Sequence, residues 1–247
     1  MPPRDCCRSR EVDVASWLAE PAAIAGRWIA YRHVARGVPP LWQGAGSTTL
    51  RQESGRWHRE GESFVQYLAL SSDGAWSEHV RYQAIRTEAR RVREHRSLWQ
   101  LRVSADQIAD LSTFDAWDAC GLDPAIAVGD HERSQALASE LRRAGYRGVL
   151  SPSAALDVEG AVNLTLFGSR IEHHIEGRPL PDEPVGGPNG RWLPVILLTD
   201  RGAPTPFAMA RTCYRMGEHR TLAEWRAARG RRRERPSRRR PGSPELS

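Results

Sequence analysis

The stretch at residues 63–92, SFVQYLALSSDGAWSEHVRYQAIRTEARRV, decides the fold, because its periodicity changes partway along. Residues 64–70 are almost all apolar, which is typical of a short strand buried on both faces. The polar run at 71–74 interrupts this pattern, and Ser72 or Asp73 can cap a helix by accepting a bond from its first turn. The sequence therefore predicts a buried strand that leads directly into a helix.

One face of the predicted helix combines five residues suited to a core with one carboxylate. The positions at steps of three and four are Ala75, Glu78, Tyr82, Ile85, Ala89 and Val92. An ionised carboxylate that faces a core is costly unless it is paired or used, so Glu78 is a candidate functional residue. Tyr67 on the preceding strand would bring an aromatic hydroxyl to the same wall of a pocket.

A purely structural interpretation of these residues stays open. Trp76 and Val80 are also apolar, so the buried face of the helix could be rotated and leave Glu78 at its edge. Arg81 is then three residues away and suited to an ordinary surface ion pair with Glu78. Tyr67 on its own fits a core position as well as a site.

Composition favours one large domain, or one domain with tails, for these 247 residues. The sequence contains no run of 18 apolar residues, so it predicts no membrane span. The charged start MPPRDCCRSREVDV lacks the apolar core of a secretory signal. The four cysteines have neither CxxC nor zinc-ligand spacing, so we expect free thiols in a reducing cytoplasm and no metal site. They are Cys6, Cys7, Cys120 and Cys213.

The positive charge is concentrated at the carboxyl end. Residues 226–247 hold nine arginines against two glutamates and carry +7, so the rest of the chain sums to −1 although the whole carries +6. Such a tail gives salt-dependent affinity for nucleic acid without sequence preference, or simply remains solvated. Every basic residue is arginine, so a mechanism that needs a lysine, such as Schiff-base formation, is excluded.

The order of the remaining patterns predicts an α+β domain with small mixed β-sheets and flanking helices. We expect a partly disordered segment at 1–24 with a short helix from residue 14, and a long loop at 37–59. A turn at 108–111 and a loose segment at 116–129 follow. A last helix from residue 221 would run into an arginine-rich disordered tail at 226–247. Strands are predicted at 27–34, 98–103, 148–151, 162–167 and 192–198, and a further helix at 134–144.

Several short motifs, taken together, resemble the RES-domain family over residues 25–170. They are Tyr31-Arg32-His33, Ser54-Gly55-Arg56-Trp57, Val65-Gln66-Tyr67-Leu68-Ala69, Ala75-Trp76-Ser77-Glu78, Ser134 at the start of a helix, Gly148-Val149-Leu150-Ser151-Pro152-Ser153-Ala154 and Asn163-Leu164-Thr165-Leu166-Phe167. Two details depart from the family pattern. The usual GGRWN run reads SGRWH, which ends at His58, and His33 follows Arg32. Residues 171–225 have no counterpart in the resemblance, and we expect them to pack on the domain as a C-terminal extension.

The resemblance implies a fold like that of ADP-ribosyltransferases and the activity of a toxin from a bacterial toxin–antitoxin pair. Members of the family consume NAD by hydrolysis or phosphorolysis, or transfer ADP-ribose to a protein. It implies a site built from Arg32, Tyr67, Glu78 and Ser134. NAD would be a substrate, with no further cofactor, and inorganic phosphate would be a possible co-substrate. The partner would be a helix-turn-helix antitoxin.

The chemistry of NAD cleavage suits these residue types. Loss of nicotinamide leaves an oxocarbenium-like ribose, whose positive charge a carboxylate such as Glu78 can stabilise. The forked guanidinium of Arg32 matches the pyrophosphate, with Arg56 as a second candidate for anion contact. Tyr67 can stack on the cationic nicotinamide ring, and Ser134 near a helix N-terminus can bind a phosphate oxygen.

Three hypotheses therefore stand after the sequence alone. The first is a toxin that consumes free NAD, and the second is an ADP-ribosyltransferase that modifies a protein. Both would use the same pocket and differ only in the acceptor. The third is a nucleic-acid-binding module that acts through the arginine-rich tail, although the body lacks a helix-turn-helix or an aromatic RNA-binding signature.

Overall fold

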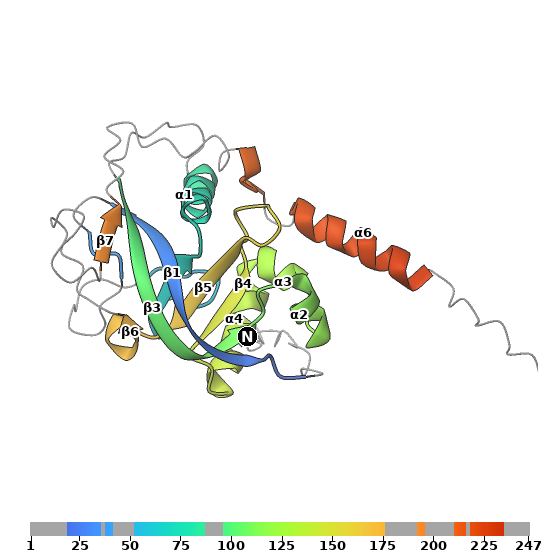
Figure 1. Cartoon of the computed structure of the whole chain (residues 1–247), viewed down its shortest axis with the longest axis horizontal. Helices are drawn as coiled ribbons and strands as arrows, with labels where there is room; N and C mark the ends of the chain where they lie inside the picture. Colours follow the sequence, from blue (N-terminus) through green and yellow to red (C-terminus); the bar gives the residue numbers. More distant parts are fainter. Residues whose placement is uncertain are drawn as a thin grey trace, which may run out of the picture.

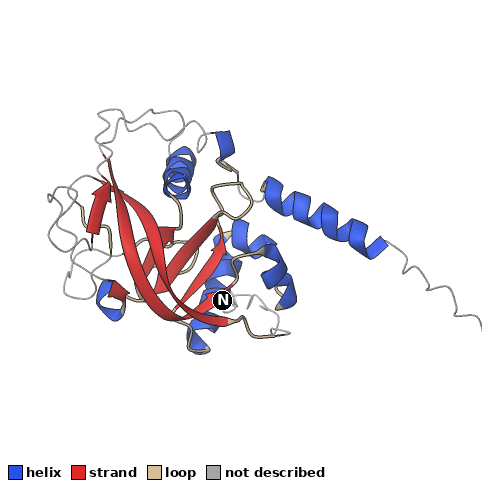
Figure 2. Ribbon diagram, viewed as in Figure 1, coloured by secondary structure: helices blue, strands red, loops and turns tan. Residues whose placement is uncertain are grey.

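The computed structural model describes residues 19–35, 38–41, 52–86, 96–175, 192–195, 210–215 and 218–234. Its described strands belong to one seven-stranded sheet, and the helices lie around it (Figures 1 and 2). A sheet with flanking helices was expected from the sequence. The expectation of several small sheets is wrong, because two long strands link all the others.

The two long strands are β1 (Ala23–Ala35) and β3 (Arg96–Asp110), which pair antiparallel along most of their length. The pairings β1–β2, β2–β5, β5–β4, β4–β3 and β3–β1 form a closed ring. Only β3–β4 within it is parallel. The other strands are β2 (Val65–Ala69), β4 (Gly148–Pro152), β5 (Val162–Phe167), β6 (His174–Ile175) and β7 (Trp192–Val195), the last two pairing with β3.

The predicted change from strand to helix is confirmed at β2 and α1 (Ser72–Arg86). The cap lies one residue earlier than expected. The hydroxyl of Ser71 accepts a hydrogen bond from Gly74 N at 3.0 Å, and its carbonyl accepts one from Ala75 N at 3.1 Å. Ser71 therefore satisfies free N–H groups of the first turn, as an N-cap residue does.

The buried stripe of α1 is rotated from the one predicted. Tyr82 is 47% exposed, whereas Trp76 is buried and the side chain of Arg81 is only 5% exposed. The alternative in which Trp76 faces inward is therefore correct. Because apolar residues occur on more than one side of this helix, spacing alone could not decide its rotation. The predicted stripe residues beyond Tyr82 have no described side chains.

Alternation along β2 and β5 gives the sheet one apolar face and one mixed face. Leu68, Leu164 and Leu166 pack in a core inside the strand ring, with residues of β1 and β3. Tyr67 and Thr165 lie directly opposite each other in the β2–β5 register and point to the other face. That second face is the one that α1 and the loop at 52–62 border.

A second core fills the space between the sheet and three helices, α2 (Phe114–Ala119), α3 (Ala125–Val128) and α4 (His131–Arg143). In Figures 1 and 2 these helices gather on one side of the sheet, apart from α1. The expectation of a loose segment at 116–129 is wrong. Both helices there are too short for a helical spacing of apolar residues to repeat in the sequence. Burial of Phe114, Trp117 and Ile126 stabilises them.

Other boundaries also differ from those expected. β3 continues through Asp110, so 108–111 is not a turn, and Ala23 and Ile24 belong to β1 rather than to a helix. Helix α6 (Arg220–Glu234) shows that the predicted disorder is wrong for 226–234. A 3-10 turn, η1 (Arg170–Glu172), follows β5. The predictions for 1–18, 42–51, 196–198 and 235–247 lie outside the described residues.

Helix α6 projects from the body (Figure 1), and its described contacts with the body come from residues between 220 and 229. Trp225 Nε1 donates to Asp115 at 2.8 Å, Arg226 lies 3.4 Å from Asp123, and Arg229 pairs with Asp118. In the described part of the chain, no helix has the length and apolar character needed to cross a bilayer. The same residues contain no cluster of three or more histidine, cysteine, aspartate or glutamate side chains that could hold a metal ion.

Candidate active site

A cavity of about 810 Å³ lies between α1, the loop at 52–58 and the start of α4, and residues of β1, β2 and β5 also line it. This volume falls within the roughly 300–1,000 Å³ of small-molecule sites. Four of the five residues predicted from the sequence line it. They are Arg32 from β1, Arg56 from the loop, Tyr67 from β2 and Glu78 from α1. Ser134, the fifth, lies outside the lining.

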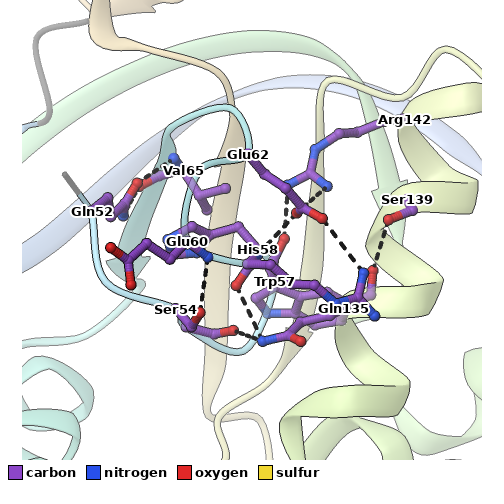
Figure 3. Close-up of polar contacts among 12 residues, drawn as sticks. Gln52, Ser54, Trp57, His58, Glu60, Glu62, Val65, Gln135, Ser139 and Arg142 are labelled. Atoms are coloured by element: carbon purple, nitrogen blue, oxygen red, sulfur yellow. Dashed lines mark hydrogen bonds and ion pairs between the residues drawn. The ribbon is translucent and has the colours of Figure 1, made fainter. Parts of the chain in front are cut away.

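The loop at 52–58 is held against α4 and β2 by side chains that bond to its backbone (Figure 3). Gln135 Nε2 donates to the carbonyls of Gly55 at 2.8 Å and His58 at 3.2 Å, and Arg142 Nη2 donates to Trp57 O at 2.7 Å. Gln52 bonds to both the N–H and the carbonyl of Val65 at 2.8 Å. The loop thus forms a fixed wall although it has almost no regular secondary structure.

Tyr67 is tied to this loop through its hydroxyl. Its oxygen accepts the N–H of Trp57 at 2.8 Å and lies 2.9 Å from His58 Nδ1. Burial raises the pKa of the tyrosine, and burial with the charge of Arg142 lowers the pKa of His58. Both groups are therefore neutral at neutral pH. A side chain on Gly55 would meet the Tyr67 oxygen at 2.5 Å, so the close approach requires glycine there.

Arg56 points its guanidinium toward the start of α4. Nη1 donates to Gly129 O at 2.9 Å and lies 3.4 Å from Ile126 O and 3.5 Å from Ser134 Oγ. Burial lowers its pKa to about 10, with Glu78 acting in the opposite direction. The residue therefore stays charged at neutral pH, and its Nη1 is committed to protein acceptors.

Ser134 supports Arg56 from behind the cavity wall. The helix begins at His131, three residues before the predicted start, and Asp130 caps it. Ser134 is fully buried, and its hydroxyl donates to the carbonyls of Ile126 at 3.0 Å and Asp130 at 3.1 Å. The structure thus brings Ser134 to Arg56 but leaves it outside the cavity lining, with its proton directed to the backbone.

Arg32 differs from Arg56 in its partners. Its neighbours on the same strand face, Ala30 and Val34, belong to the core within the strand ring, which explains its burial. Burial lowers the pKa of Arg32 to about 10, so it too stays charged. Its Nη1 atom is buried and has no hydrogen-bond partner in the described structure. An unpaired charged donor at a cavity wall is costly unless a ligand completes it.

Glu78 lines the cavity from α1. Its Oε1 accepts a hydrogen bond from Asn163 Nδ2 at 2.7 Å and one from Ser153 Oγ at 3.4 Å. Arg81 does not form the predicted surface pair, because it is buried and donates to the carbonyl of Ala154. The carboxylate is thus half-buried, oriented by two neutral donors, and directed to the wall that the cavity shares with β5.

His131 adds a neutral imidazole to the cavity wall. Burial lowers its pKa to about 4, and the charges of Arg56 and Arg81 act in the same direction. Asp130 opposes the shift, and His58 adds to it. At neutral pH the anion-binding character of this region therefore comes from the arginines alone.

Three residues with clear structural roles were missed or misjudged from the sequence. Asn163 was quoted within a motif but given no role, although a polar residue on an otherwise apolar strand was a usable signal. His58 was noted only as a departure from a family pattern. Arg81 was assigned to the surface, and no feature of its local sequence indicates that it is buried.

Comparison with known proteins places these observations in a family. A model described as the RES domain matches residues 29–185. Among solved structures, a chain from the crystal structure of the M. tuberculosis MbcT–MbcA toxin–antitoxin complex is 23% identical, with a TM-score of 0.45. That match covers 70% of this chain and 83% of the other. Comparison with curated protein sequences gave no match.

Proposed function

Because this chain belongs to the RES-domain family, we propose that it is the toxin of a bacterial toxin–antitoxin pair and consumes NAD. The reaction is cleavage of the bond between nicotinamide and ribose, by hydrolysis or phosphorolysis. One observation carries the proposal. The unpartnered, charged donor of Arg32 and the oriented carboxylate of Glu78 line the same cavity.

The two groups suit different parts of a dinucleotide. The guanidinium of Arg32 would bind the pyrophosphate, which supplies the acceptor oxygens that the buried Nη1 lacks. Glu78 would lie against the ribose and stabilise the positive charge that develops as nicotinamide leaves. Asn163 and Ser153 favour this use because both donate to the same oxygen, Oε1, which leaves Oε2 for the ribose.

Tyr67 would border the nicotinamide end of the pocket. It lines the cavity and stays neutral, and its ring can stack on a cationic heterocycle. The rigid 52–58 loop would keep this ring and Arg56 in place without cost at the moment of reaction. Ser134 would act indirectly, by holding Arg56.

Hydrolysis, phosphorolysis and protein modification differ only in the group that accepts ADP-ribose. Water would give ADP-ribose, inorganic phosphate would give a phosphorylated ADP-ribose, and a protein side chain would give an ADP-ribosylated target. A helix-turn-helix antitoxin would suppress the activity in the cell. The substrate pocket is the same in each case.

Product analysis with purified protein tests the proposal. We expect release of nicotinamide from NAD, with a second product whose mass depends on whether phosphate is present. Radiolabel from NAD appearing on protein would select the ADP-ribosyltransferase alternative. If NAD remains intact with and without phosphate and with cell extract as acceptor, the proposal fails.

A further inference from the structure

The loop that holds Glu78 is itself held by a segment beyond residue 185, where the family match ends. We use the name C-terminal strap for residues 211–213 and 219–222. The strap adds a short bridge to the loop at 153–157, in which Leu156 pairs with Thr212. Cys213 N donates to Ala155 O at 2.7 Å, and Asp157 N donates to Arg211 O at 2.9 Å.

The loop at 153–157 also caps helix α6, whose first residues belong to the strap. Asp157 accepts hydrogen bonds from Arg220 N at 2.8 Å and Thr221 N at 2.9 Å, and from the Thr221 hydroxyl. Burial pushes the pKa of Asp157 up, but the Thr221 and Arg220 bonds outweigh it and lower that pKa. The cap of α6 is therefore supplied by a residue far away in sequence.

His219 forms the connection closest to Glu78. It is 4% exposed, and its Nε2 lies 3.1 Å from Ser153 O. A carbonyl only accepts, so Nε2 carries the proton and donates. Nδ1 then accepts the N–H of Leu222 at 3.4 Å. Nδ1 also lies 3.3 Å from Asp157 Oδ1, and burial lowers the pKa of the imidazole although this carboxylate acts in the opposite direction. The ring therefore joins the strap to the backbone of Ser153.

The side chain of Ser153 connects this backbone to the carboxylate of Glu78. Its Oγ accepts the N–H groups of Leu156 at 3.0 Å and Ala155 at 3.3 Å, which leaves its proton for Glu78 at 3.4 Å. Arg81 on the helix of Glu78 donates to the neighbouring carbonyl of Ala154. Both ends of the contact between Glu78 and the loop are thus fixed by the fold.

We propose that the C-terminal strap completes the site, and that His219 is a positioning residue which orients Glu78 through Ser153. This inference rests on the proposed function for the role of Glu78, but its structural part does not. A group placed to stabilise the transition state affects kcat rather than substrate binding when it is displaced. The strap therefore contributes to turnover without touching NAD.

The test compares His219→Ala with His219→Gln in the full chain. Glutamine can retain a donor near the position of Nε2, whereas alanine cannot. We expect alanine to lower kcat for NAD cleavage about tenfold, on the scale of a small misplacement of a catalytic group, with KM within about twofold. Glutamine should recover most of kcat. His173→Ala is the matched control, since it removes another buried imidazole and should leave kcat within about twofold.

A second measurement reads the geometry without NAD. The side-chain amide of Asn163 donates to Glu78, so its NMR resonance reports the position of the carboxylate. It should shift in His219→Ala and stay in place in His219→Gln and His173→Ala. Ser153→Ala removes the link without altering the strap residues. Ser153→Ala should lower kcat as His219→Ala does. If His219→Ala does not fold, the kcat of Ser153→Ala tests whether this link orients Glu78.

Three outcomes are distinguishable. A folded His219→Ala with unchanged kcat and an unchanged Asn163 amide overturns the inference, as does full kcat in Ser153→Ala. Failure of the wild type to consume NAD overturns the proposed function instead, and the Asn163 resonance then decides the inference about the strap. A kcat loss in His219→Ala that glutamine restores, with the amide shift, supports both.

Discussion

Arg32 and Arg56 line the same cavity, and burial lowers both pKa values to about 10, yet their hydrogen-bond partners differ. Arg56 donates to the carbonyl of Gly129 and lies close to Ser134 Oγ. Within the residues that the structure describes, the buried Nη1 of Arg32 has no protein acceptor. A buried donor that is already paired with protein carbonyls belongs to the scaffold, whereas an open donor is preorganised for an anionic ligand.

The same contrast separates the two walls of the cavity. Side chains fix the wall formed by the 52–58 loop. Gln135 and Arg142 of α4 donate to its backbone carbonyls, and the side chain of Gln52 bonds to the backbone of Val65 in β2. The wall formed by α1 presents Glu78, whose described hydrogen-bond donors all bind one oxygen, Oε1. We therefore expect changes on the second wall to affect turnover most and changes on the first to affect stability most.

The largest effect is expected for Glu78→Gln. The substitution keeps the shape of the side chain but removes the charge that would stabilise the ribose, so turnover should fall roughly a hundredfold or more. Thermal unfolding should stay unchanged or improve, because a half-buried charge is gone. The readouts are NAD loss, thermal unfolding and growth arrest on expression without an antitoxin.

Glu159→Gln is the matched control for this variant, because Glu159 is an exposed carboxylate in the loop that follows Asp157. It should leave turnover and growth arrest at wild-type levels. Unchanged turnover in Glu78→Gln would mean that the carboxylate is structural. The two walls would then not differ in the way described.

The same substitution at the two arginines tests the contrast between them directly. Lysine keeps the charge but lacks the planar fork. Arg32→Lys should raise KM for NAD about tenfold or more, with little change in thermal stability. Arg56→Lys should lower the free energy of unfolding by about 1–2 kcal/mol, because buried carbonyls lose a well-placed donor, with a much smaller change in KM.

Each variant serves as the control for the other. A reversed result, with KM altered only in Arg56→Lys, would make Arg56 the pyrophosphate contact. Equal changes in KM would place the anion between the two guanidinium groups. Titration of NAD into the Glu78→Gln background separates binding from turnover in both variants.

How far the sequence predicted this arrangement depends on how local each signal is. The β2–α1 transition follows from periodicity within 63–92, and the strand at 162–167 was predicted with its observed bounds. Arg32, Arg56, Tyr67 and Glu78 were named through motif resemblance, and the structure brings them to one cavity. In these cases the pattern lies within the element that carries the residue.

Features that depend on distant contacts were not predicted. The rotation of α1 is set by what packs on Trp76 and Arg81, and the burial of Arg81 depends on Ala154, 73 residues away. Helices α2 and α3 are too short to show a helical period. The role of His219 depends on Ser153, 66 residues earlier, so no window of local sequence contains both partners.

Acidification should lower the free energy of unfolding through His131, which lines the cavity at the start of α4. His131 has a pKa of about 4 in the folded protein against 6.5 for the free side chain, so only the unfolded state takes up its proton between these values. The free energy of unfolding should therefore fall as pH drops from about 6.5 toward 4, and not change from this group above that range. The slope should stay below about 1.4 kcal/mol per pH unit for this residue, because solvent screens it partly.

His131→Gln is the test, with unfolding in denaturant measured between pH 7 and pH 5. The variant should have a shallower pH dependence than the wild type. A slope should remain, because burial also lowers the pKa values of His58, His173 and His219. An identical slope in the two proteins would show that burial does not lower the pKa of His131 as described.

The smallest effect is expected from removal of residues 231–247. The described contacts of α6 with the body come from residues between 220 and 229, all before the cut. NAD turnover should therefore stay within about twofold of the full chain, since no group of the cavity or its walls is removed. Salt-dependent binding of nucleic acid should fall sharply, because seven of the nine arginines of the 226–247 tail are lost.

A longer truncation gives the contrast that makes this result informative. Removal of 219–247 takes away His219 and the α6 segment that Asp157 caps, and should lower kcat even where the protein still folds. If both truncations leave turnover intact, the C-terminal strap is not needed and Glu78 is positioned by Asn163 alone. If the shorter truncation already abolishes turnover in a folded protein, the arginine-rich end acts in the site itself. The two walls of the cavity would then not account for the activity, because a charge outside both of them would be required.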